Sequence, residues 1–231
     1  REMIDTINSA ITKYKQIAEI ALTADDAGRI EKTGKRAIYI GMENGFPLAK
    51  DVTRVGEFHG KGVRYITLCH SNNNDICDSS NDRKGPEHNG LSEFGKEVVK
   101  EMNRLGMMVD VSHSSDDTVR DVLETSTAPI IASHSSARAL YDHPRNLPDE
   151  LLLAIAAKGG VVQATIEYVR AHDSYEREEL PTVVEFVDHI DHIVAVAGID
   201  HVGIGTDFDG GGELTDCYDV SELRAITREL V

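Results

Sequence analysis

Residues 107–136, MMVDVSHSSDDTVRDVLETSTAPIIASHSS, contain two short apolar runs that both end in Ser-His-Ser-Ser, with a helical pattern between them. The first run carries His113 and the second carries His134. Strand, helix and strand in succession are typical of a βαβ unit, whose parallel strands end at the same edge of a sheet. We therefore expect the two imidazole rings to lie close together.

The same alternation continues on both sides of this unit. Four further apolar runs lie at residues 36–44, 62–70, 159–168 and 200–210, and helical patterns lie at 92–106, 115–126, 148–160 and 181–198. The apolar runs are continuous, as in strands that are buried on both faces of a parallel sheet. The pattern predicts an α/β fold, with one added helix over residues 3–21 and a polar, functional loop over 71–90.

Residues that could bind metal or move protons lie at the ends of five of these runs. They are Glu43, His70, His113, His134 and Asp207. Side chains from many strand ends converge at the mouth of a (β/α)8 TIM barrel, whereas an open sheet offers a single crevice. Six strands are two short of a closed barrel. We interpret residues 1–231 as one catalytic domain, an incomplete barrel that lacks N-terminal strands and is truncated at both ends.

Composition excludes several classes of partner. The chain has 24 Lys plus Arg against 40 Asp plus Glu, a formal net charge of -16. Such a surface repels phosphate backbones and anionic lipid headgroups, which predicts no nucleic-acid partner and no membrane contact. No apolar run approaches the ~20 residues of a membrane span. Three irregularly spaced cysteines predict buried thiols rather than a disulfide framework.

The strand-end residues favour a metal centre. Imidazole nitrogen and carboxylate oxygen are the usual ligands of catalytic zinc, so we predict that Glu43, His113 and His134 bind metal. Asp207 would lie beside this centre as a base. The alternative is that the histidines only cap the core and that the acidic residues belong to turns. The serines beside the two histidines are expected to orient the rings or to cap the following helices.

One further pair in the sequence has the composition of a metal motif. His189 and Asp191 form the only H-x-D of the chain, inside the helical pattern 181–198. Residues two apart in a helix point to different faces. We therefore interpret this pair as part of a solvated helix face.

Longer motifs carry a resemblance to a known family. They are GMENG (41–45), YITLCHSNNN (65–74), GLSEFGKEVVKEMNRLGMMVDVSH (90–113), PIIASHSSARAL (129–140), HPRNLPDE (143–150) and VAGIDHVGIGTDFDG (196–210). In this order, from about residue 37 to 230, the chain resembles the renal-type (membrane) dipeptidase family. The resemblance implies an amidohydrolase-like TIM barrel with two zinc ions, a dipeptide substrate that a metal-bound hydroxide hydrolyses, and a homodimer.

The resemblance also implies a role for each site residue. Glu43 matches the glutamate that bridges the two metals, and His113 and His134 match the ligands of the second zinc. His70 matches a histidine that binds the substrate at its scissile carbonyl. Arg145 matches the arginine that grips the terminal carboxylate, and Asp207 matches the acid/base aspartate.

One part of the family pattern is missing from the sequence. The family holds its first zinc partly through an H-x-D pair after the first strand, and His189 and Asp191 cannot replace that pair. The pair then belongs to sequence upstream of residue 1, or the first metal site is absent. The alternatives to a dipeptidase are therefore a non-catalytic peptide-binding homologue without the first metal, and another amidohydrolase-type hydrolase.

Overall fold

Strands and helices alternate along most of the chain in the computed structural model, which describes residues 2–171 and 179–231. The strands are β1 (Ala18–Ile20), β2 (Arg36–Ile38), β3 (Ile40–Glu43), β4 (Val63–Thr67), β5 (Met108–Asp110), β6 (Ile131–Ala132), β7 (Val161–Ala164) and β8 (Val202–Ile204). The helices are α1 (Glu2–Lys13), α2 (Ala24–Glu31), α3 (Thr53–Gly60), α4 (Glu93–Leu105), α5 (Asp116–Thr125), α6 (Asp149–Ala157), α7 (Val183–Ala197) and α8 (Arg224–Glu229). Short 3-10 turns occur at Phe46–Leu48, Ile199–His201, Phe208–Gly210 and Val220–Glu222.

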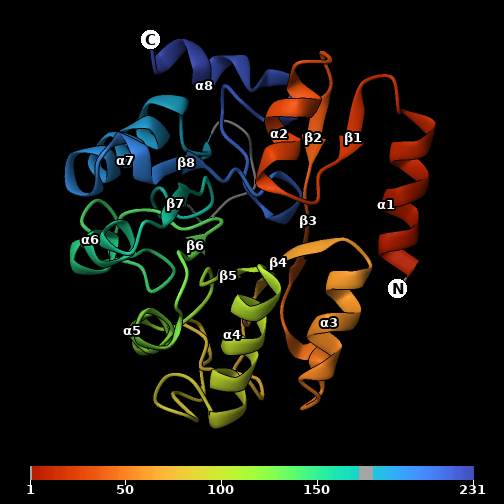
Figure 1. The fold of residues 1–231 in the computed structure, drawn as a ribbon. Helices are drawn as coiled ribbons and strands as arrows, with labels where there is room; N and C mark the ends of the chain where they lie inside the picture. Colours follow the sequence, from red (N-terminus) through yellow and green to blue (C-terminus); the bar gives the residue numbers. More distant parts are fainter. Residues whose placement is uncertain (1, 172–178) are drawn as a thin grey trace.

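The six predicted strand runs form one parallel sheet. Its order is β3-β4-β5-β6-β7-β8, and every neighbouring pair is parallel. The strands occupy the middle of the molecule, and the helices α3 to α7 surround them in sequence order (Figure 1). This arrangement confirms the predicted α/β fold and corresponds to an arc of a TIM-like barrel.

The N-terminal prediction is partly wrong, because the expected helix over 3–21 ends at Lys13 and is followed by β1. The backbone of this segment pairs with β2 instead of continuing the helix: Arg36 N donates to Ile17 O at 2.8 Å, and Ala21 N donates to Ile38 O at 2.8 Å. β1 and β2 are parallel. Since β2 and β3 are the two halves of the predicted run 36–44, β1 is a further parallel strand beside that run.

The four other predicted helices are confirmed, and their ends have the expected chemistry. The Ser92 side chain accepts from Gly95 N at the start of α4, and Gly106 closes that helix with a left-handed φ of 72°. The Ser115 side chain accepts from Thr118 N at the start of α5. These caps satisfy backbone groups that a helix end leaves unpaired.

The expectation of a solvated H-x-D face is wrong for one of its two residues. Asp191 is exposed, but His189 is 1% exposed and lies on the inner face of α7. Its Nδ1 accepts from Ala137 N at 3.1 Å, and its Nε2 lies 3.0 Å from Val169 O. A ring that is satisfied by two backbone partners can stay buried without charge. His189 therefore supports α7 against the sheet.

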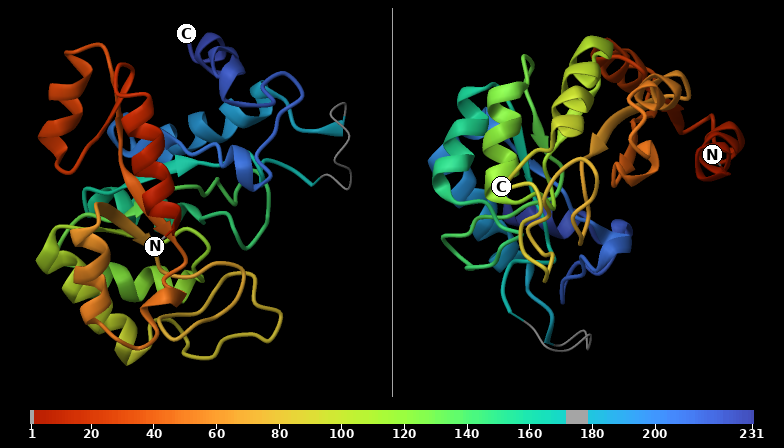
Figure 2. Two further views of the ribbon diagram at one scale, coloured as in Figure 1. Left: turned by 90° about the vertical axis from the view of Figure 1, so that its right-hand side faces the viewer. Right: turned by 90° about the horizontal axis from the view of Figure 1, so that it is seen from below.

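One apolar cluster lies between the sheet and its helices and includes Val98 of α4, Val109 of β5 and Phe186 of α7. Residues 71–90 form a long loop without helix or strand, as predicted. In the left view of Figure 2 this yellow loop and the green loop after β6 project to the same side of the molecule. The three cysteines are buried, and none of them is in a disulfide. No helix in the described part of the chain has the length and apolar character that crossing a membrane requires.

Candidate metal centre

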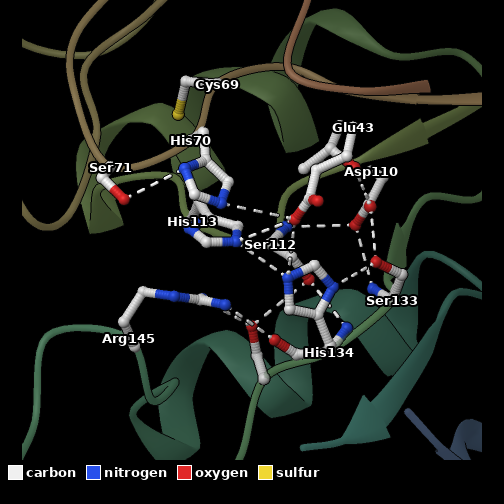
Figure 3. A network of polar contacts seen from close by, with 12 residues as sticks. Glu43, Cys69, His70, Ser71, Asp110, Ser112, His113, Ser133, His134 and Arg145 are labelled. Carbon is white, nitrogen blue, oxygen red and sulfur yellow. Dashed lines mark hydrogen bonds and ion pairs between the residues drawn. The ribbon is translucent and has the colours of Figure 1, made fainter. Parts of the chain in front are cut away.

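Three of the predicted ligands meet at the C-terminal edge of the sheet. Glu43 is the last residue of β3, His113 follows β5, and His134 follows β6. Glu43 Oε1 lies 3.1 Å from His113 Nε2 and 3.3 Å from His134 Nε2, and the two Nε2 atoms are 2.8 Å apart. The three ligand atoms point toward one another (Figure 3). No other group of three or more potential ligands occurs within residues 2–171 and 179–231.

A chain of hydrogen bonds fixes the orientation of His134. Ser133 Oγ lies 2.6 Å from Asp110 Oδ2 and 2.8 Å from His134 Nδ1. An ionised carboxylate only accepts, so the single Ser133 hydroxyl proton goes to Asp110. Ser133 Oγ then accepts from His134 Nδ1–H, which leaves the lone pair of His134 Nε2 available for a cation. This is the usual arrangement behind a histidine that binds metal.

His113 is held neutral by its surroundings. Only 6% of the residue is exposed, and burial lowers the pKa of its ring to about 4, although the hydrogen bond to Glu43 opposes this shift. The adjacent rings of His113 and His134 hold the pKa of the Glu43 carboxyl well below its usual value. Near neutral pH the site therefore offers the neutral imidazole of His113, the imidazole of His134 and the carboxylate of Glu43. The donor set fits zinc, which prefers these ligand types.

His113 also has two local features that set it apart. Its φ is 68°, in the left-handed region that residues other than glycine rarely adopt. Its Nδ1 is buried and has no hydrogen-bond partner. The loop 71–90 instead holds the backbone of His113. Ser80 N and Ser79 Oγ both donate to His113 O. The loop therefore fixes the position of this histidine through its carbonyl.

Two further predicted residues border this centre. His70 Nε2 lies 3.8 Å from Glu43 Oε1, and the His70 ring stands over the His113 ring with the centroids 4.2 Å apart. Asp207 lines a cavity of about 190 Å³ together with Ser133 and His134. Burial raises the pKa of the Asp207 carboxyl, and the charge of Glu43 acts in the same direction. A carboxyl with a raised pKa is suited to carrying a proton.

Arg145 lies beneath the loop that carries His134. The residue is 2% exposed, its Nη2 donates to His134 O at 3.1 Å and its Nη1 lies 3.5 Å from Ser135 Oγ. Arg145 Nε has no hydrogen-bond partner, and the carboxylates of Glu167, Asp110 and Asp207 act on the guanidinium only through their charge. A buried guanidinium without a paired carboxylate is poised to accept one from a ligand.

Sequence reasoning missed Asp110, the carboxylate that supports the two histidine-bearing loops. Asp110 is fully buried, and its carboxylate accepts from four donors: Thr67 Oγ1, Ser112 N, Ser133 N and Ser133 Oγ. The serines were expected to orient the rings or to cap helices, and Ser133 and Ser115 do so. An acidic residue three positions before His113 was the available signal for Asp110.

Comparison with known proteins identifies the family of the chain. The model of the membrane dipeptidase family, peptidase family M19, matches residues 1–231. The chain belongs to the membrane dipeptidase family. Dipeptidase verJ of Clonostachys rogersoniana is 42% identical over 209 residues, which are 90% of this chain and 52% of that protein. Dipeptidase tcpJ of Claviceps purpurea is 40% identical over 90% of this chain and 48% of that protein. The chain thus spans about half the length of these relatives.

Solved structures of the family share the fold. A probable dipeptidase PvdM from Pseudomonas aeruginosa superposes with a TM-score of 0.92 and 31% identity, over 98% of this chain and 71% of that one. A metallo peptidase from Rhodobacter sphaeroides, liganded with a phosphinate mimic of the dipeptide L-Ala-D-Ala, superposes with a TM-score of 0.87 and 27% identity. The match covers 99% of this chain and 66% of that one. The incomplete barrel of this membrane dipeptidase homologue is therefore a part of the family fold.

Proposed function

We propose that the full-length protein is a zinc-dependent dipeptidase with two metal ions, in which Glu43 bridges the metals and His113 and His134 hold the second one. The observation that carries the proposal is the convergence of one carboxylate and two imidazole nitrogens, with the two Nε2 atoms 2.8 Å apart. Two Nε2 atoms at this distance are bridged either by the N–H of one ring, as a hydrogen bond, or by a cation that both bind. Membership of the family makes the cation the better interpretation.

Bound zinc would supply a Lewis acid for the scissile carbonyl and a water molecule of lowered pKa. The remaining work falls to the side chains of the chain itself. His70 borders Glu43 and would donate a hydrogen bond to the oxygen of the carbonyl as negative charge develops there. One donor of this kind contributes about 3 kcal/mol to the transition state. Asp207 would accept the proton of the attacking water and transfer it to the leaving nitrogen.

Arg145 would set the length of the substrate. Its buried guanidinium lies directly behind the backbone of the metal ligand His134. A carboxylate bound there by two hydrogen bonds would end the substrate just beyond the scissile bond. We expect short substrates with an unblocked C-terminal carboxylate, including those with a D-residue at that end.

The test uses purified full-length protein. We expect about two zinc ions per chain and hydrolysis of Gly-D-Ala, and His113→Ala should remove the second zinc and at least 99% of kcat/KM, roughly the loss seen when a catalytic group is removed. The matched control is His192→Ala, because His192 pairs with Asp149 at the surface and should retain metal and turnover.

Other outcomes would favour the alternatives. Zero or one metal ion with tight dipeptide binding and no turnover would indicate a non-catalytic peptide-binding homologue. Hydrolysis of N-acetyl amino acids or lactones in preference to Gly-D-Ala would indicate another amidohydrolase-type activity. Full activity of the His113→Ala variant would refute the metal assignment.

A further inference from the structure

Arg145 lies against a stack of flat side chains, formed by Tyr141, His143 and Tyr168 and here called the ring stack. The Tyr141 and His143 rings are 5.8 Å apart and tilted by 12°, and the His143 and Tyr168 rings are 4.4 Å apart and tilted by 14°. The guanidinium carbon of Arg145 lies over the Tyr168 ring, 5.3 Å from its centroid. A cation over an aromatic face is attracted by the ring quadrupole.

The ring stack connects two loops at the C-terminal edge of the sheet. Tyr168 follows β7, whereas Tyr141 and His143 belong to the loop between β6 and α6. His143 contacts Arg145 a second time, because Arg145 N donates to His143 Nδ1 at 3.2 Å. The backbone and the charged end of Arg145 thus both depend on the same stack.

The position of the guanidinium rests on few contacts. Nearby carboxylates act on it only through their charge, and Arg145 Nε is buried without a hydrogen-bond partner. Its remaining contacts are His134 O, Ser135 Oγ and the face of Tyr168. Since the first two bind only the Nη ends, the Tyr168 face is the one side-chain surface among these contacts that lies against the central carbon of the guanidinium.

We infer that Tyr168 and His143 are positioning residues that hold Arg145 in the orientation for a substrate carboxylate. The inference rests on the proposed dipeptidase function and assigns two residues to its carboxylate recognition. Both residues contact Arg145, so we expect their contribution to belong to the affinity for a carboxylate and not to the chemical step. Substrates or ligands without that carboxylate should be insensitive to both.

Tyr168 has a second set of contacts that the test must separate from the first. Its hydroxyl interacts with the side chains of Glu167 and Asn81. Tyr168→Phe removes the hydroxyl and keeps the aromatic face, whereas Tyr168→Leu removes both. His143→Phe keeps a flat ring beside Tyr168, and His143→Leu removes it. Both changes also remove Nδ1, which accepts the hydrogen bond from Arg145 N.

The experiment compares KM and kcat for Gly-D-Ala in the full-length zinc enzyme. We expect Tyr168→Leu to raise KM about tenfold, as the loss of a desolvated cation–π contact allows, with kcat within about twofold. Tyr168→Phe should stay within about twofold of the wild type in both constants. In a variant that already carries Arg145→Lys, the further change Tyr168→Leu should raise KM little, because both changes act through the side chain at position 145.

Equilibrium binding provides a readout that does not depend on turnover. A phosphinate dipeptide mimic with a terminal carboxylate is compared with its carboxamide in the same four variants. The affinity for the carboxylate ligand should fall about tenfold in Tyr168→Leu and in His143→Leu, as expected for KM. The affinity for the carboxamide should not change. Tyr14→Leu is the matched control, since Tyr14 carries a cation contact with Lys13 at the end of α1, away from the site.

The outcomes separate this inference from the function on which it rests. Equal losses for carboxylate and carboxamide ligands, or a lower kcat at unchanged KM, would overturn the positioning role. A wild-type protein that binds the mimic selectively but hydrolyses no dipeptide would refute the dipeptidase and leave the ring stack assignment standing.

Discussion

Asp110 connects both histidine-bearing loops, although it does not touch the metal ligands itself. Its carboxylate accepts from Ser112 N beside His113 and from two groups of Ser133 beside His134. A fully buried carboxylate is tolerated only where donors compensate its lost hydration. Asp110 therefore couples the two loops and sets the hydrogen-bond direction through Ser133.

The first prediction concerns this coupling. Ser133→Ala should reduce zinc affinity or activity by 10- to 100-fold, about the effect of removing the partner that fixes a ligand's tautomer. Competition with a chelator, followed by metal analysis, measures the loss. Ser126→Ala is the matched control, because the Ser126 side chain bonds Ala128 O and Asn103, away from the centre. Equal zinc affinity in both variants would contradict the tautomer argument.

The second prediction concerns the charge of His113. Burial lowers the pKa of this ring to about 4 in the folded chain, whereas an unfolded chain protonates it near 6.5. Between these values the unfolded state binds the extra proton, so stability is complete above pH 6.5 and falls as the pH falls toward 4. The contribution is on the order of 3 kcal/mol over this window.

Urea unfolding of the zinc-depleted full-length protein tests this dependence. The loss of unfolding free energy between pH 7 and about 4.5 should be smaller in His113→Gln than in the wild type. His192→Gln should follow the wild type, because His192 is partly exposed and pairs with Asp149. Parallel pH profiles for wild type and His113→Gln would show that the ring is not held neutral in the fold.

At the scale of residues, the sequence predicted which strand-end side chains meet and that serines orient the rings, but it did not predict the role of Asp110. Strand-end positions are visible because an apolar run stops there, and this pattern is sufficient to predict that Glu43, His113 and His134 lie close together. The role of Asp110 depends on register, since Asp110 pairs with Ile131 and so meets Ser133. Register between parallel strands follows from packing of both faces and leaves no local signal in the sequence.

At the scale of elements, the end of β8 approaches the backbone of the neighbouring loop. A Cβ on Gly205 would stand 2.1 Å from the carbonyl oxygen of Ser133. This is a backbone atom and cannot move away as a flexible side chain would. The close approach that the glycine allows brings Asp207 into the same cavity as His134.

The third prediction follows from this contact. Gly205→Ala should displace either Ser133 or the segment before Asp207, with a stability loss of about 1–3 kcal/mol and a clear drop in turnover. Gly28→Ala is the matched control, since nothing lies within 4 Å of its added Cβ in α2. Alanine there should be neutral or stabilising by up to ~1 kcal/mol. Thermal unfolding and kcat/KM of both variants measure the contrast, and similar behaviour would contradict the role assigned to Gly205.

The elements that were missed share weak local patterns. β1 has three residues, and its apolar positions also fit the helical spacing of the segment before it. α2 and α3 have eight residues each and contain Gly28, Gly56 and Gly60, which lower helix propensity. α2 and α3 form because they pack against the strands. Such tertiary contacts leave no local pattern in the sequence. The long amphipathic helices with polar caps, α4 and α7, were predictable because local and tertiary preferences agree.

At the scale of the whole molecule, packing is unevenly distributed. The main apolar cluster includes buried residues of β4 to β7 and of the helices that cover them. The first helix, α1, has no buried residue and contacts the cluster only through partly buried Ile4 and Ile7. Figure 1 shows α1 at the periphery, beside β1 and away from the helices α4 to α7. Local stability should therefore rise from the N-terminal elements toward the sheet.

The last prediction tests this gradient by amide hydrogen exchange on the 231-residue chain. Amides of β4 to β7 should exchange only through global unfolding, and amides of α1 at least about a hundredfold faster, because opening α1 exposes little apolar surface. α4 is the matched control: it has 13 residues against 12 in α1, but it buries Gly95, Val98, Val99 and Met102. The amides of α4 should exchange as slowly as those of the sheet. If α1 and α4 were equally protected, the packing of α1 on Ile4 and Ile7 would contribute as much as a buried helix face, and the proposed gradient would be wrong.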